Sequence, residues 1–174
     1  MQMISESTTP LVEYSRTGKL ITELDRVLDK IVTGLIIVTT KYEGIPYGMT
    51  AAWFSRASNN PYMVMISISK SSCTMAHVEK SKIFAINIID DSQKALADFF
   101  GNNTGREINK FEKISYSKWK SGAPILEKNA CSAIDCKVVN QIESGDHMVF
   151  LGEVLEGKSL SKREPYLYNR KDFL

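Results

Sequence analysis

The segment Gly48-Met49-Thr50-Ala51-Ala52-Trp53-Phe54-Ser55 and the later segment Asn60-Pro61-Tyr62-Met63-Val64-Met65-Ile66-Ser67 are the most informative parts of this chain of 174 residues. They predict two strands with a turn of small residues, Thr-Ala-Ala, between them. Small side chains let backbone N–H and C=O groups come close to a bound molecule. Such a turn therefore suits the edge of a flat aromatic ligand.

The remaining pattern predicts a mainly β fold with a few helices. Apolar residues recur at helical spacing from Thr22 until Gly34 ends the run. Strands are predicted at 35–40, 45–50, 62–69, 83–89, 132–141, 147–155 and 166–168, and short helices at 72–79 and 92–100. Residues 101–122 form a long polar segment, and loops of that length are usually functional or covered by a partner. Short turns and few intervening helices favour a closed antiparallel barrel.

Composition indicates one domain, residues 21–174, behind a polar N-terminal arm of residues 1–20. Hydrophobic residues make up 43% of the chain and charged residues 24%, which suffices for a sizeable core. The net charge of +2 gives no reason to expect nucleic acid or a membrane as a partner. Neither a membrane-spanning segment nor a signal peptide is recognisable, so we expect a cytoplasmic protein.

Three cysteines, Cys73, Cys131 and Cys136, fit reduced thiols better than a disulfide framework. They lack zinc-binding spacing, and only His77 and His147 could add imidazole ligands, so no metal site is expected. Cys136 alternates with apolar residues and is predicted to be a buried structural thiol.

Hydroxyl groups and one cation cluster where a predicted strand meets a predicted helix. Ser67 ends the strand region, and Lys70, Ser71, Ser72 and Thr74 follow at the helix start. Helix N-termini present free N–H groups and a positive dipole end, so they bind anions readily. A phosphate would be well held there. The alternative is an ordinary N-cap beside a solvated lysine.

The segment from Lys70 to Thr74 and three further motifs together resemble the flavin reductase-like family of FMN-binding split barrels, in which the position of Lys70–Thr74 holds the FMN phosphate. The first is Thr50-Ala51-Ala52-Trp53, and the second is the loop Thr104-Gly105-Arg106-Glu107-Ile108-Asn109-Lys110-Phe111. The third is Gly145-Asp146-His147, followed by Gly152-Glu153-Val154. The resemblance runs from about Gly34 to Tyr168. Asn109 stands where the family usually has an acidic residue, which puts any contact of that carboxylate in doubt.

The resemblance implies an antiparallel split β-barrel of Greek-key type that binds FMN without a covalent link at a homodimer interface. The contacts it implies for the cofactor are Thr50, Ala51, Ala52, Trp53, Ser67, Lys70, Ser71, Ser72, Thr74, Arg106, Lys110 and Phe111. His147 is placed near the face where nicotinamide lies and is the catalytic candidate. For Trp53 the alternative is core packing, for the loop cations a solvated surface, and for His147 a structural role.

Three functions follow from the resemblance. The first is an NAD(P)H-dependent flavin reductase, and no Gly-x-Gly-x-x-Gly motif offers a separate nicotinamide site. A flavin-dependent monooxygenase is a possible partner for such an enzyme. The second is a flavoredoxin-like electron carrier with a protein redox partner. The third is a flavin-binding domain without turnover.

Overall fold

The computed structural model describes residues 20–168, which fall into two units that divide before Thr33. The predicted arm of residues 1–20 therefore lies almost entirely outside the described residues, and the predicted domain of residues 21–174 stays a prediction. The first unit contains helix α1 (Glu23–Leu28), which begins at the predicted N-cap, Thr22. A capping box joins Thr22 and Asp25 in both directions. The helix ends at Leu28, earlier than the apolar spacing predicts, and it buries no residue.

The second unit is built on one seven-stranded sheet with the order β2-β1-β5-β8-β9-β4-β3, in which every pairing is antiparallel. Its strands are β1 (Ile36–Tyr42), β2 (Ile45–Ala51), β3 (Phe54–Asn59), β4 (Tyr62–Ser69), β5 (Ile83–Ile88), β8 (Ser132–Ser144) and β9 (His147–Ser159). A small second sheet pairs β6 (Ser117–Lys118) with β7 (Pro124–Ile125). The mainly β, antiparallel prediction is confirmed, although β3 was not expected.

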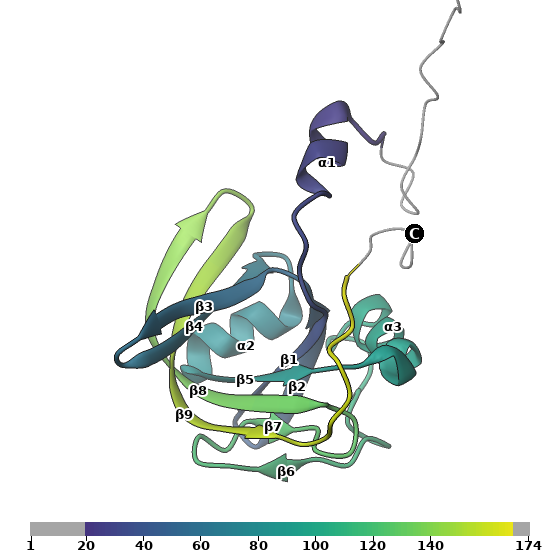
Figure 1. Cartoon of the computed structure of the whole chain (residues 1–174). Coiled ribbons are helices and arrows are strands. Elements are labelled where there is room, and N and C mark those ends of the chain that lie inside the picture. Colours follow the sequence, from purple (N-terminus) through teal and green to yellow (C-terminus); the bar gives the residue numbers. More distant parts are fainter. Residues whose placement is uncertain (1–19, 169–174) are drawn as a thin grey trace, which may run out of the picture. The chain divides into compact units, whose positions relative to one another are not determined.

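The connection between β2 and β3 shows why this sheet must curl. The two strands are the opposite edges of the sheet, yet only Ala52 and Trp53 separate them in sequence. Seven strands in a flat sheet would place the edges about 29 Å apart, whereas three residue steps span at most about 11 Å. The edges therefore approach each other at this link, and the sheet forms a barrel that is not fully closed (Figure 1).

Two helices and a short 3-10 turn complete the second unit. α2 (Cys73–Ser81) follows β4 directly and packs against β1 and β2. α3 (Lys94–Asn102) follows the 3-10 turn η1 (Asp91–Gln93) and packs mainly on β2. Both helices match the prediction within a few residues. The C-terminal part of the unit returns to the start of the sheet, where Leu167 forms a bridge with Gly34.

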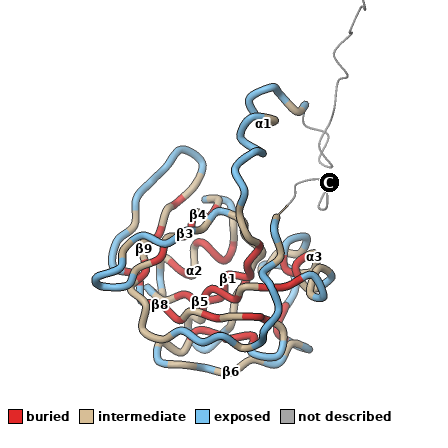
Figure 2. The backbone as a smooth tube through the Cα atoms, in the orientation of Figure 1, coloured by how far each residue is buried: buried red, intermediate tan, exposed pale blue. Residues whose placement is uncertain are grey.

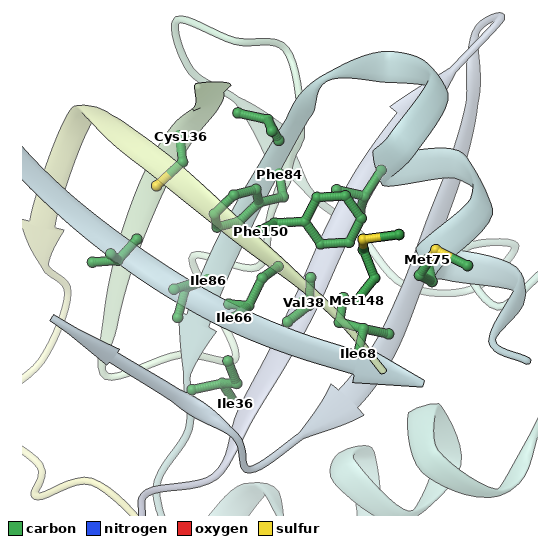
Figure 3. Close-up of a cluster of buried hydrophobic side chains, with 13 residues drawn as sticks. Ile36, Val38, Ile66, Ile68, Met75, Phe84, Ile86, Cys136, Met148 and Phe150 are labelled. Atoms are coloured by element: carbon green, nitrogen blue, oxygen red, sulfur yellow. The ribbon is translucent and has the colours of Figure 1, made fainter. Parts of the chain in front are cut away.

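The barrel interior is the core of the second unit. Figure 2 shows that buried residues lie on β1, β5 and β8 and on α2. The burial of β4 alternates along the strand, with Val64, Ile66 and Ile68 facing inward. Figure 3 shows Phe84 and Phe150 side by side within the main cluster, to which the predicted buried thiol Cys136 also belongs. Within residues 20–168, no helix combines the length and apolar character needed to cross a membrane.

Candidate functional site

The N-terminus of α2 presents backbone N–H groups that a bound anion could accept from. Ser72 is the N-cap, and its side chain accepts a hydrogen bond from the Met75 N–H. The N–H groups of Cys73 and Thr74 donate to no acceptor within residues 20–168, as is usual in the first turn of a helix. Ser71 is exposed, and its hydroxyl lies 2.9 Å from that of Ser69. Thr74 is buried.

Two cations stand beside this helix end. The Arg106 guanidinium donates to the Ser71 carbonyl at 3.1 Å and so joins the loop after α3 to the start of α2. Lys70 precedes the helix, and its Nζ lies 3.0 Å from an oxygen of Glu143 in β8. Both cations are solvent-accessible. The structure thus brings together Lys70, Ser71, Ser72 and Arg106, as the sequence predicts.

A second group of predicted residues gathers on the outer face of β4 and β9. His147 pairs with Ser69 across the two strands, and Ser67 pairs with Val149 two positions along the same face. The exposed ring of Trp53 lies 4.5 Å from the His147 ring, centre to centre, and tilts by 33° against it. The Trp53 carbonyl accepts the backbone N–H of Ser67. Trp53 is 57% exposed, so the alternative of core packing is wrong.

The orientation of the His147 ring is set by its neighbour. Its Nδ1 lies 2.7 Å from a carboxylate oxygen of Asp146, and a carboxylate can only accept. In the neutral ring, Nδ1 therefore carries the hydrogen and Nε2 the lone pair. The same turn holds the start of α2, because the Lys70 backbone N–H donates to the Asp146 carbonyl at 2.9 Å.

The Thr-Ala-Ala segment forms the end of β2 and the link to β3. Ala51 and Ala52 are partly exposed and precede the exposed Trp53. The Thr50 hydroxyl donates to the Ala97 carbonyl at 2.6 Å, so this side chain fastens β2 to α3. Of this motif, Ala52 is partly exposed and Trp53 is exposed, Ala51 packs against the main core cluster, and the Thr50 hydroxyl is already engaged.

Two predicted cofactor contacts, Lys110 and Phe111, take structural positions instead. Lys110 is 5% exposed, and its ammonium donates to the Gly48 carbonyl at 2.9 Å and the Phe100 carbonyl at 2.7 Å. Burial lowers the pKa of Lys110 to about 8. Phe111 is 7% exposed and packs edge-to-face against Phe100. The prediction for both is corrected: they anchor the loop to β2 and α3.

Sequence reasoning did not identify every residue around the site. Ser69 and Glu143 were not among the predicted site residues, and the ion pair of Glu143 with Lys70 and the pairing of Ser69 with His147 depend on how the strands are arranged. A cavity of about 410 Å³ was also not foreseen, and its walls come from residues 45–48 and 105–110. Its signal in the sequence was the long polar segment 101–122, which was expected to be functional or covered.

Comparison with known proteins places these features in a family. The family model for the flavin reductase like domain matches residues 28–174. The reductase subunit HsaB of a flavin-dependent monooxygenase from Rhodococcus jostii (strain RHA1) is 31% identical over 147 residues, which cover 84% of this chain and 73% of that protein.

Two solved structures are also similar to this chain. The flavin reductase PheA2 superimposes with a TM-score of 0.75 at 31% identity, covering 86% of this chain and 95% of that one. The NADH:FAD oxidoreductase SgcE6 of Streptomyces globisporus C-1027 gives a TM-score of 0.78 at 28% identity, covering 84% and 87%. By the extent of the family match and by these likenesses, the chain belongs to the flavin reductase-like family.

Proposed function

We propose that the protein is an NAD(P)H-dependent flavin reductase. The main observation behind this proposal is that the residues at the start of α2 are connected to those on the outer face of β4 and β9. The anion site at the start of α2 and the Trp53–His147 pair are joined through Lys70, whose backbone N–H is bound by the turn that precedes His147. Family membership and the reductases among the similar proteins support the same function.

The donor set at the start of α2 fits the phosphate of a flavin nucleotide. The unpartnered N–H groups of Cys73 and Thr74 and the positive end of the helix favour a dianion there. Lys70 and Arg106 add two positive charges, and the Ser71 hydroxyl adds a donor. Within this proposal FMN is held without a covalent bond, with its phosphate on these groups.

The ring system would lie against the exposed side of the Trp53–His147 pair. A flavin ring bound there supplies the acceptor for the hydride of NAD(P)H, and this transfer needs proximity more than a proton shuttle. Ala51 and Ala52 let the backbone approach the ring edge. His147 would contact the nicotinamide side and offer its Nε2 lone pair, since Nδ1 is held by Asp146. His147 thus acts chiefly by positioning.

A second copy of the chain is part of this proposal. Apolar side chains of the first unit are exposed, including Leu24 at 65% and Val27 at 56%, and a partner subunit would cover them. The family resemblance places the cofactor at such an interface. A flavin-dependent monooxygenase is the proposed user of the reduced flavin, as the name of the Rhodococcus relative suggests. A cytoplasmic location stays a prediction.

An anaerobic absorbance spectrum of the protein with FMN, before and after NADH or NADPH, tests the function. Loss of the oxidised-flavin absorbance supports a reductase and identifies the nicotinamide. Flavin that binds but stays oxidised contradicts this function and favours an electron carrier. A protein that binds neither FMN nor FAD leaves only the non-catalytic alternative.

The phosphate position is tested separately with Lys70→Ala, using Lys128→Ala as a surface control of equal charge. Lys70 is partly exposed, so its loss should cost about 1 kcal/mol of FMN affinity, or roughly fivefold in Kd. Riboflavin, which lacks the phosphate, should bind the variant and the wild type equally. Equal loss for both ligands would place the phosphate elsewhere.

A further inference from the structure

Lys110 is a buried cation without a negative partner. It is 5% exposed, and its ammonium donates to two backbone carbonyls, those of Gly48 and Phe100. Within residues 20–168 no carboxylate forms an ion pair with it. A buried charge is usually paired, because taking it out of water costs free energy that neutral acceptors offset only in part. An uncompensated positive charge therefore lies inside the second unit.

The surrounding fold explains why this position accepts a cation at all. Phe100 lies in the last turn of α3, where backbone carbonyls have no helical partner and the helix dipole is negative. β2 is an edge strand, so the carbonyls along its free side lack a strand partner as well. The ammonium also lies 5.6 Å from the centre of the Phe100 ring. These neutral groups hold Lys110 in place but do not neutralise its charge.

The loop that contains Lys110 packs against the start of α2. Lys110 and Arg106 line the same cavity, and Arg106 donates to the Ser71 carbonyl at the start of this helix. A Cβ on Gly105 would lie 3.5 Å from the sulfur of Cys73, the first residue of α2. The buried charge is therefore close to the turn on which the proposed function places the phosphate.

A negative charge at this helix end favours the protonated form of Lys110. Burial lowers the pKa of Lys110 to about 8, and the interaction with Cys73 acts in the opposite direction. Near pH 8, about half of the free protein molecules therefore carry this proton. A phosphate dianion bound beside Cys73 would act in the same direction as Cys73 and with a larger charge. Its binding should therefore be accompanied by the uptake of a proton.

We propose that Lys110 is a third cation of the phosphate site, which acts on the bound phosphate through the protein interior without contacting it, so that FMN binding and protonation of Lys110 favour each other. The inference rests on the proposed function, since that function places the phosphate at the start of α2. It deepens that function, because it makes the affinity for the cofactor depend on pH. The Kd of FMN should rise as the pH rises through about 8, since the free protein then loses a proton that the complex keeps.

Other ionisable groups lie on the elements around Lys110. They are Tyr47 in β2, Cys73 and His77 in α2, Lys94 and Asp98 in α3, and Arg106, Glu107 and Glu112 in the loop. Burial raises the pKa of Tyr47, so its hydroxyl stays protonated in this range. Thiol and imidazole groups can change charge near neutral pH. The variants Cys73→Ser and His77→Gln therefore separate these two groups from Lys110.

Calorimetry of FMN binding to the full chain, in two buffers of different ionisation enthalpy, counts the protons taken up. At about pH 8 the wild type should take up as much as about half a proton per FMN, whereas riboflavin, which lacks the phosphate, should bind without this uptake. Lys110→Met should abolish the uptake and raise the Kd of FMN about fivefold at about pH 7, with riboflavin unaffected. Lys113→Met, at an exposed lysine of the same loop, is the matched control and should change neither quantity. Cys73→Ser and His77→Gln should keep the uptake.

The proposal is overturned if FMN binds to the wild type without proton uptake, if the uptake persists in Lys110→Met, or if it vanishes in Cys73→Ser or His77→Gln. The wild-type measurement decides even if Lys110→Met does not fold. FMN binding without proton uptake would leave the proposed function standing. Bound FMN that takes up a proton but is not reduced by NAD(P)H would contradict that function alone, and a chain that binds no flavin would overturn both.

Discussion

Gly152 in β9 should not tolerate a methyl group, although it lies in ordinary strand backbone. A Cβ built there would lie 2.4 Å from Cζ and 2.6 Å from Cε1 of the Phe84 ring, and 3.0 Å from Cβ of Cys136. Carbon atoms in contact are normally about 3.5–4.0 Å apart. The ring of Phe84 is completely buried, so it would have to shift by about 1 Å inside a close-packed core.

Overpacking of this kind costs about 1–3 kcal/mol. Alanine recovers part of that cost, because replacing glycine in a strand stabilises by roughly 0.5–1 kcal/mol. Gly152→Ala is therefore expected to lower the free energy of unfolding by about 1–2 kcal/mol. For a chain of this length, the melting temperature falls by about 2–4 °C for each kcal/mol.

Urea unfolding gives the measurement, and β9 provides its own control. Gly157 lies in the same strand, and the nearest atom to a Cβ there is the Ala133 carbonyl oxygen, at the ordinary distance of 3.7 Å. Gly157→Ala should leave stability unchanged or raise it slightly. Phe84→Leu should be less harmful in the Gly152→Ala background than in the wild type, since it removes the clashing atoms. Equal stability of Gly152→Ala and Gly157→Ala would refute the packing argument.

Three further predictions concern the polar contacts. In the folded protein Lys110 has a pKa of about 8, below its ordinary value of 10.5. Between these two pH values the unfolded chain binds more protons than the folded protein does. The free energy of unfolding should therefore rise with pH in this window. The urea midpoint should rise with pH in the wild type and should not rise in Lys110→Met. An identical rise in both proteins would contradict the assignment of this effect to Lys110. Glu143→Gln should release Lys70 and tighten FMN about two- to fivefold without affecting riboflavin, as dialysis can measure. Thr50→Val should cost about 0.5–1.5 kcal/mol in urea unfolding, because the hydrogen bond that joins β2 to α3 is lost. Unchanged stability would show that this hydrogen bond contributes nothing.

The regular elements were predictable where sequence periodicity was strong. Alternation along 62–69 and the β-branched run at 35–40 correspond to β4 and β1. β3 was missed because its sequence, Phe54–Asn59, is mostly polar and exposed. It is an edge strand that pairs with β4, and a local sequence pattern cannot predict such a pairing.

The candidate site was predictable in part. A helix start with hydroxyl residues and a lysine is a local signal, and the structure places it as expected. The contact between Trp53 and His147 depends on the register of β4 and β9, which residue types alone do not specify. Lys110 was misplaced because charged side chains are rarely buried, so a surface role was the natural expectation.

The reactivity of the three cysteines can be used to measure how different parts of this structure open. Cys131 and Cys136 are at most 1% exposed, whereas Cys73 is 9% exposed at the first turn of α2. A thiol reagent can reach each sulfur only when the surrounding structure opens. Modification of Cys136 would therefore follow global unfolding of the barrel, while modification of Cys73 would follow local fraying at the helix end. A phosphate ligand that occupies this helix end should slow the modification of Cys73 while leaving that of Cys136 governed by overall stability.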